Sequence, residues 1–96
     1  MAKIYFQGET VRQKAYVTDE SGALIDPSSI LITVVDSGGV KKVEAQAMSK
    51  DATGKYHHDY LLASDAALGQ WLVEVKAVLG FTAIEQDQFT VVESAA

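Results

Sequence analysis

The sequence predicts an all-β fold made of two packed sheets. Apolar and polar residues alternate with a period of two along most of the chain, as expected for strands with one buried face. Turn-forming residues recur at short intervals, and no long segment has the 3.6-residue period of a helix. The chain has 96 residues, of which 48% are hydrophobic. This is enough for one core, so a single domain over residues 1–96 is expected.

Each element follows from local pattern. The clearest is 30–35, where Ile30, Ile32 and Val34 share one face and the residues between them share the other. Residues 50–54 are predicted to form a turn, 64–69 one helical turn capped by Ser64 or Asp65, and 93–96 a frayed tail. Seven strands are expected in all, at residues 3–6, 10–18, 30–35, 40–48, 55–62, 71–78 and 82–92.

Seven short strands without a long helix are typical of an immunoglobulin-like Greek-key sandwich. Four motifs of turn and core residues occur in the order expected for such a sandwich. They are Tyr5-x-x-Gly8-Glu9-Thr10-Val11, Val17-Thr18-Asp19-x-x-Gly22, Asp51-x-x-Gly54-x-Tyr56 and Gly69-x-Trp71-x-Val73-x-Val75. With these motifs the chain resembles immunoglobulin-like modules of prokaryotes. It is also similar to macroglobulin-type and carboxypeptidase-regulatory-like sandwiches and to short proteins encoded among phage head and tail genes. The resemblance implies a fold and a non-catalytic structural or binding role.

Composition removes several classes of function. The chain has no cysteine, so it offers no disulfide, zinc thiolate or cysteine nucleophile. Thirteen acids against eight bases give a net charge of -5, which argues against nucleic acid and anionic membranes as partners. The whole excess lies in residues 57–96, which hold six acids and one base. This asymmetry fits either solubility or steering of a partner.

The sequence contains no pattern for catalysis or for a cofactor. On a strand, His57 and His58 point to opposite faces, so they cannot bind one metal ion together. Neither the Gly-x-Ser-x-Gly elbow nor the Gly-x-x-x-x-Gly-Lys phosphate loop is present. Asp19, Asp26 and Asp51 are expected in loops at one end, where calcium binding stays open beside the simpler reading as turn residues. We therefore expect no enzyme, no cofactor and no metal site.

A docking surface is the predicted functional feature. If strand 30–35 pairs with strand 71–78, the outward side chains of both strands lie on one nominally wet face. These candidate interface residues are Leu31, Val35, Leu72 and Val78, with the exposed aromatic Tyr16 as a secondary candidate.

Two main settings are expected for such a surface, and an accessory domain of an enzyme is a third. The first is a structural protein of a phage or virus-like particle, located in the virion or the host cytoplasm, which docks on a capsid protein, another structural protein or a second copy. The alternative is a module of a secreted or cell-surface protein that acts as an adhesin, spacer or carbohydrate-binding unit.

Overall fold

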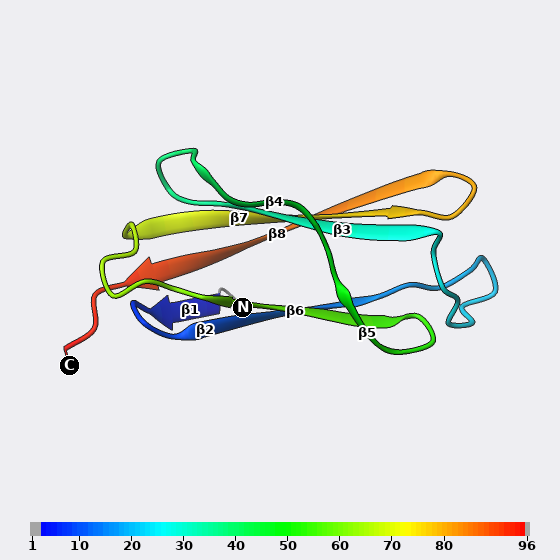
Figure 1. Cartoon of the computed structure of the whole chain (residues 1–96), viewed down its shortest axis with the longest axis horizontal. Helices are drawn as coiled ribbons and strands as arrows, with labels where there is room; N and C mark the ends of the chain where they lie inside the picture. The colour runs from blue at the N-terminus through cyan, green and yellow to red at the C-terminus, as the bar shows by residue number, and fades with distance from the viewer. Residues whose placement is uncertain (1–2, 96) are drawn as a thin grey trace.

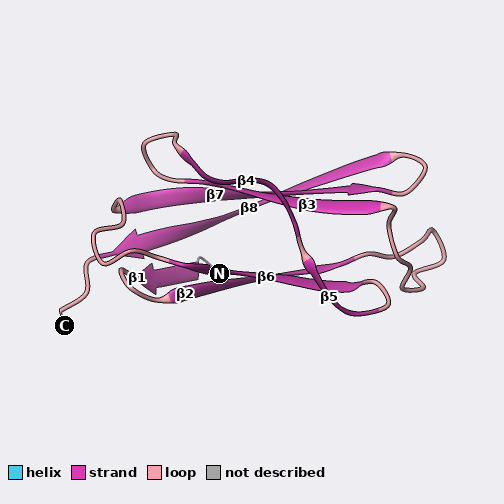
Figure 2. Ribbon diagram, in the orientation of Figure 1, coloured by secondary structure: helices cyan, strands magenta, loops and turns pink. Residues whose placement is uncertain are grey.

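The computed structural model describes residues 3–95 and consists of strands joined by turns (Figures 1 and 2). Met1, Ala2 and Ala96, which belong to the predicted domain and tail, lie outside the described residues. No helix long and apolar enough to cross a bilayer occurs within residues 3–95. The strands are β1 (Lys3–Phe6), β2 (Thr10–Tyr16), β3 (Ser29–Val35), β4 (Lys41–Ala47), β5 (Ser49–Ala52), β6 (Lys55–Leu61), β7 (Gly69–Val78) and β8 (Thr82–Val92).

The strands form two layers that face each other along a body of 45 × 22 × 22 Å (Figure 1). The larger sheet has the order β1-β8-β7-β3-β4, and the smaller has the order β2-β6-β5. β1 runs parallel to β8, whereas the other pairings are antiparallel. The predicted all-β, immunoglobulin-like sandwich is confirmed, with eight strands instead of seven.

The core lies between the layers because the alternating apolar residues point inward. Trp71 is 1% exposed and its ring lies 5.7 Å from that of Phe89. Its indole Nε1–H donates to the Ala67 carbonyl oxygen at 2.8 Å, so the one polar atom of the ring has a partner. Ile32, Leu62 and Val91 surround this centre with at most 1% exposure.

The added strand is β5, and the prediction of a turn over 50–54 was too long. The chain leaves the larger sheet after β4 and crosses to the smaller one at Met48, which is buried (Figure 1). Only Thr53 and Gly54 remain as the turn between β5 and β6. β5 was not predicted from the sequence because all four of its residues are exposed, so the segment lacks the apolar–polar alternation of a half-buried strand.

The predicted helical turn over 64–69 was wrong. Residues 62–68 form an irregular loop with a turn at Ser64 and Asp65. Side chains from other segments donate hydrogen bonds to backbone carbonyl oxygens of this loop. The Gln7 side-chain amide donates to the Ala66 carbonyl oxygen at 2.7 Å, and the Ser37 hydroxyl donates to the Leu68 carbonyl oxygen at 2.7 Å. Tertiary contacts thus replace the helical hydrogen bonds of a weakly helical segment.

Candidate interaction surface

The predicted pairing of the two central strands is present, and it brings two of the candidate residues together. In the β3–β7 ladder, Val35 is the direct partner of Leu72. Both side chains are half-buried and alternate with inward-facing residues, so they lie on the outer face of the larger sheet. Cross-strand neighbours of this kind contact each other directly.

The other two candidates lie further along the same face. Leu31 is the partner of Lys76, and Val78 is the partner of Ser29. Ile84 of β8, 56% exposed, flanks Lys76 from the other side. The register therefore groups Leu31, Val78 and Ile84 around one lysine.

A polar row separates the two apolar groups. Thr33, Glu74 and Gln86 lie side by side on β3, β7 and β8. The Gln86 side-chain amide donates to the Glu74 carboxylate at 3.0 Å, and the Thr33 hydroxyl accepts from the Ala45 amide at 3.0 Å. The four residues predicted as one cluster are thus arranged as two smaller groups.

β1 adds two apolar side chains to this face that sequence analysis missed. Tyr5 points inward, where its ring lies edge-on to Phe89 at 5.4 Å. Its neighbours Ile4 and Phe6 therefore point outward, and they are 61% and 49% exposed. The parallel register places them beside Thr90 and Val92 of β8. We call Ile4, Phe6, Val35, Leu72 and Val92 the docking face.

The polar residues inside the docking face are already bonded to each other. Gln70 on β7 donates to Gln88 on β8 at 2.7 Å, between the β1 residues and Leu72.

The alternation within residues 3–6 was the available sequence signal for Ile4 and Phe6. Their position on the same sheet face as Leu72 depends on the pairing of β1 with β8, two segments more than 80 residues apart, and local sequence pattern does not specify this pairing.

Tyr16 lies elsewhere. It is the last residue of β2 in the smaller sheet and is 64% exposed. Together with Phe81, also 64% exposed, it lines a cavity of ≈ 160 Å³ between β2 and β8. Tyr16 therefore belongs to a separate surface from the other four candidates.

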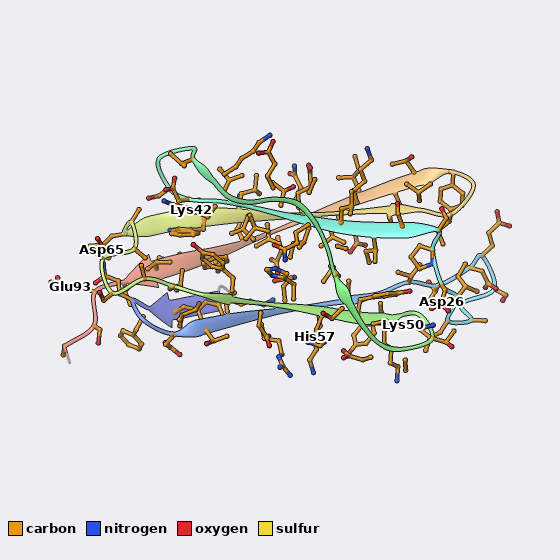
Figure 3. The ribbon with its side chains drawn as sticks, viewed as in Figure 1. Asp26, Lys42, Lys50, His57, Asp65 and Glu93 are labelled. Atoms are coloured by element: carbon orange, nitrogen blue, oxygen red, sulfur yellow. The ribbon has the colours of Figure 1, made fainter. Side chains whose placement is uncertain are left out.

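The three carboxylates expected in loops at one end each bond to the chain itself, and Asp51 lies in β5 instead of a loop. Asp26 accepts from Lys50 Nζ at 2.8 Å, and Figure 3 shows these two side chains at one end of the molecule. It also accepts from the Gly54 amide at 3.0 Å and from the Tyr56 hydroxyl at 3.1 Å. The bonds from Lys50 and Gly54 lower the pKa of Asp26 below its usual range. Asp19 caps its own turn by accepting from Ser21 and Ala23.

The two histidines are placed as the strand geometry requires. His57 lies on the outer side of the smaller sheet, with Nδ1 2.6 Å from Asp51 Oδ1 (Figure 3). His58 lies between the sheets beside Gln13, and burial lowers its pKa. Arg12 makes a two-bond contact with Asp59, at 2.7 and 2.8 Å. Within residues 3–95, no three histidine, cysteine or acidic side chains gather as they would around a metal ion.

Comparison with known proteins agrees with this architecture. Residues 3–91 match the MG2 domain family. The chain belongs to the MG2 domain family. Among solved structures it is similar to the Lin-41 filamin domain, with 15% sequence identity, a TM-score of 0.69 and coverage of 94% of this chain and 83% of that one. No curated protein matches the chain.

The family match defines this chain as an MG2 domain, and the likeness to the filamin domain shows that the two share an immunoglobulin-like fold. They confirm the macroglobulin-type part of the resemblance seen in the sequence. Such a module is consistent with a non-catalytic binding or structural role.

Proposed function

We propose that this MG2-family domain is a non-catalytic docking module that attaches to another protein through the docking face. The observation that supports this most is that the exposed Ile4 and Phe6 and the half-buried Leu72 lie on the same outer sheet face, where only Gln70, Gln88 and Thr90 stand between them. Large apolar side chains gathered on a wet face mark interaction surfaces more often than scattered ones do. Covering this face would contribute several kcal/mol at about 25 cal/mol per Å² of apolar area, before the cost of association.

The partner we propose is a structural protein of a phage or virus-like particle, which places the chain in the virion or in the host cytoplasm. Attachment to a particle requires a stiff fold and one docking face, without chemistry. The resemblance of the turn and core motifs to phage head and tail proteins supports this setting.

A second setting is favoured by the family match. MG2-type and filamin-type sandwiches share this fold, and the filamin domain of Lin-41 is by its name one part of a protein. In this setting the chain is a module of a secreted or cell-surface protein, and the docking face contacts a neighbouring module or a partner outside the cell.

Sedimentation with particles tests the docking face and the first setting together. We expect the purified chain to sediment with particles isolated from the source culture, and Leu72→Glu to reduce the bound fraction at least about tenfold by placing a charge in an apolar contact. Leu61→Glu is the matched control, because Leu61 is 67% exposed on the smaller sheet.

The outcomes separate the alternatives. If Leu72→Glu sediments like the wild type, or Leu61→Glu is the variant that is lost, the docking face is wrong. If the wild type stays in solution beside the particles, the virion setting fails. The mass of the intact gene product in cell extracts then tests the second setting, which requires a protein larger than the 10.3 kDa of this chain.

A further inference from the structure

Within residues 3–95, one edge of β8 has no partner strand over most of its length. β1 pairs with β8 only at Phe89–Val92. Over Thr82–Gln88, which we call the open β8 edge, the described residues place a strand on the β7 side alone. Alternate backbone N–H and C=O groups of such an edge point away from the sheet and can pair with another strand.

A groove runs along this edge between the two sheets. β2 is the facing edge of the smaller sheet, and two adjoining cavities of ≈ 160 and ≈ 300 Å³ separate it from β8. Ala15, Val75 and Glu85 line both cavities. Val75 points between the sheets but is only half-buried, whereas Val73 and Ala77 on the same strand are buried. The sheets therefore leave room here for the side chains of an added strand.

The side chains of the open β8 edge that face the groove are small or acidic. Ala83, Glu85 and Asp87 are the register partners of inward-facing β7 residues and so share their orientation. Asp87 is neutralised by Lys3, whose Nζ lies 2.9 Å from its carboxylate. Glu85 has no cationic partner among the described residues. Beyond Ala83, the groove continues as a cavity lined mostly by apolar residues, among them Phe81, Leu79 and Ile30, with Tyr16 at its margin.

The sequence of side chains along the groove determines which side chains an added peptide strand would need. A side chain opposite Glu85 is favourable if it is a lysine or arginine. The next groove-facing side chain, two residues along, lies opposite Ala83 at the cavity that Leu79 and Phe81 also line, and is favourable if it is large and apolar. The net charge of -5 on residues 57–96 adds a long-range attraction for a basic segment.

A second copy of the chain fits the same edge poorly. Antiparallel pairing of two open β8 edges would bring Glu85 and Asp87 of one copy close to the same acids of the other. Like charges opposite each other destabilise a strand pair. We propose that the open β8 edge binds an extended peptide segment of another protein that carries a lysine or arginine two residues from a large apolar residue. This site is separate from the docking face, and neither depends on the other.

Titration with a designed peptide tests the proposal. The probe is a seven-residue amidated peptide with threonine at positions 1, 3, 5 and 7 and leucine, lysine and leucine between them. Its counterpart has glutamate in place of lysine. Amide hydrogen exchange and chemical shifts of the labelled protein report the site. We expect the lysine peptide to slow exchange at alternate amides of Thr82–Gln88 and to bind about fivefold more tightly than the glutamate peptide.

Charge reversal supplies the control. Glu85→Lys is expected to invert the preference between the two peptides, because it replaces the partner charge on an exposed residue. Glu44→Lys changes the net charge equally but lies on β4, at the far edge of the larger sheet, and should leave the preference unchanged.

Three results would overturn the proposal. One is unchanged exchange at Thr82–Gln88 at millimolar peptide, which would mean that the inward acids serve only to prevent strand pairing. Another is an equal loss of preference in Glu44→Lys and Glu85→Lys, which would reduce the binding to general charge attraction. The third is protection of the edge on raising the protein concentration alone, which would make a second copy its occupant.

Discussion

At the scale of single residues, Gly54 controls how the β5–β6 turn fits against the neighbouring loop. Its φ is +70°, and it is buried. A Cβ at this position would lie 2.7 Å from the Val17 carbonyl oxygen and 3.0 Å from the Ile25 amide nitrogen. Both contacts are with backbone, so no side-chain rotation can relieve them.

Gly54→Ala should therefore lower the free energy of unfolding by about 3 kcal/mol or more, measured by urea denaturation. Gly39→Ala is the control, because Gly39 has φ +84° but a Cβ added there would meet no atom within 4 Å. It should lose only the cost of the left-handed conformation, about 1–2 kcal/mol. Equal losses in the two variants would show that the close approach to Val17 has no effect.

His58 makes the stability of the fold depend on pH. Burial lowers its pKa from 6.5, and the nearby Asp59 offsets part of this effect. The unfolded chain therefore binds a proton more readily than the folded one, and stability falls as pH decreases through 6.5. We expect a lower free energy of unfolding at pH 5.5 than at pH 7.5, and a smaller difference in His58→Gln. An unchanged difference in that variant would assign the pH effect to other groups.

At the scale of elements, β4 is an irregular edge strand held by a side chain. Its register against β3 shifts on both sides of Val34. Ala45, with φ 46°, is the only non-glycine among residues 3–95 with a positive φ, and its amide donates to the Thr33 hydroxyl at 3.0 Å. A bulge of this kind twists an edge strand and makes it a poor template for pairing with another chain.

Ala45→Gly is expected to stabilise the protein by about 0.5–1 kcal/mol. Glycine removes the cost of a left-handed alanine, which exceeds the entropy that glycine loses on folding. Ala47→Gly, in the same strand, should instead destabilise the protein by about 0.5–1 kcal/mol, because Ala47 has no positive φ and glycine there only adds conformational entropy to the unfolded chain. Thermal unfolding of both variants measures this, and a loss of stability in Ala45→Gly would contradict the account of the bulge.

Elements with one buried face could be predicted from sequence, and elements without one could not. β3 and β7 carry alternating apolar residues that enter the core, and their pairing followed from the expected Greek key. β5 sends no side chain into the core, and its pairing with β6 depends on backbone hydrogen bonds that any sequence can make.

The docking face was predicted in part. Leu72 and Val35 follow from the alternation of apolar residues, whereas the contribution of β1 depends on a parallel pairing between the two ends of the chain.

At the scale of the whole molecule, the two proposed surfaces lie on different sides of the larger sheet, the docking face outside and the groove beside β8 inside. The larger sheet has five strands and the smaller one three, and two cavities lie between the edge strand β2 and β8. The outer face of the larger sheet carries β1 at one end, where Ile4 and Phe6 are exposed. The smaller sheet presents mainly charged groups outward, such as Arg12 paired with Asp59.

The central claim is that the docking face, on the outside of the larger sheet, is the surface by which this domain attaches to its partner. Hydroxyl-radical footprinting of the particle-bound chain measures side-chain exposure residue by residue. We predict that bound protein shows reduced labelling at Ile4, Phe6 and Leu72, with Leu61 labelled as in the free chain. Protection of Leu61 with unchanged labelling at Phe6 and Leu72 would contradict the claim.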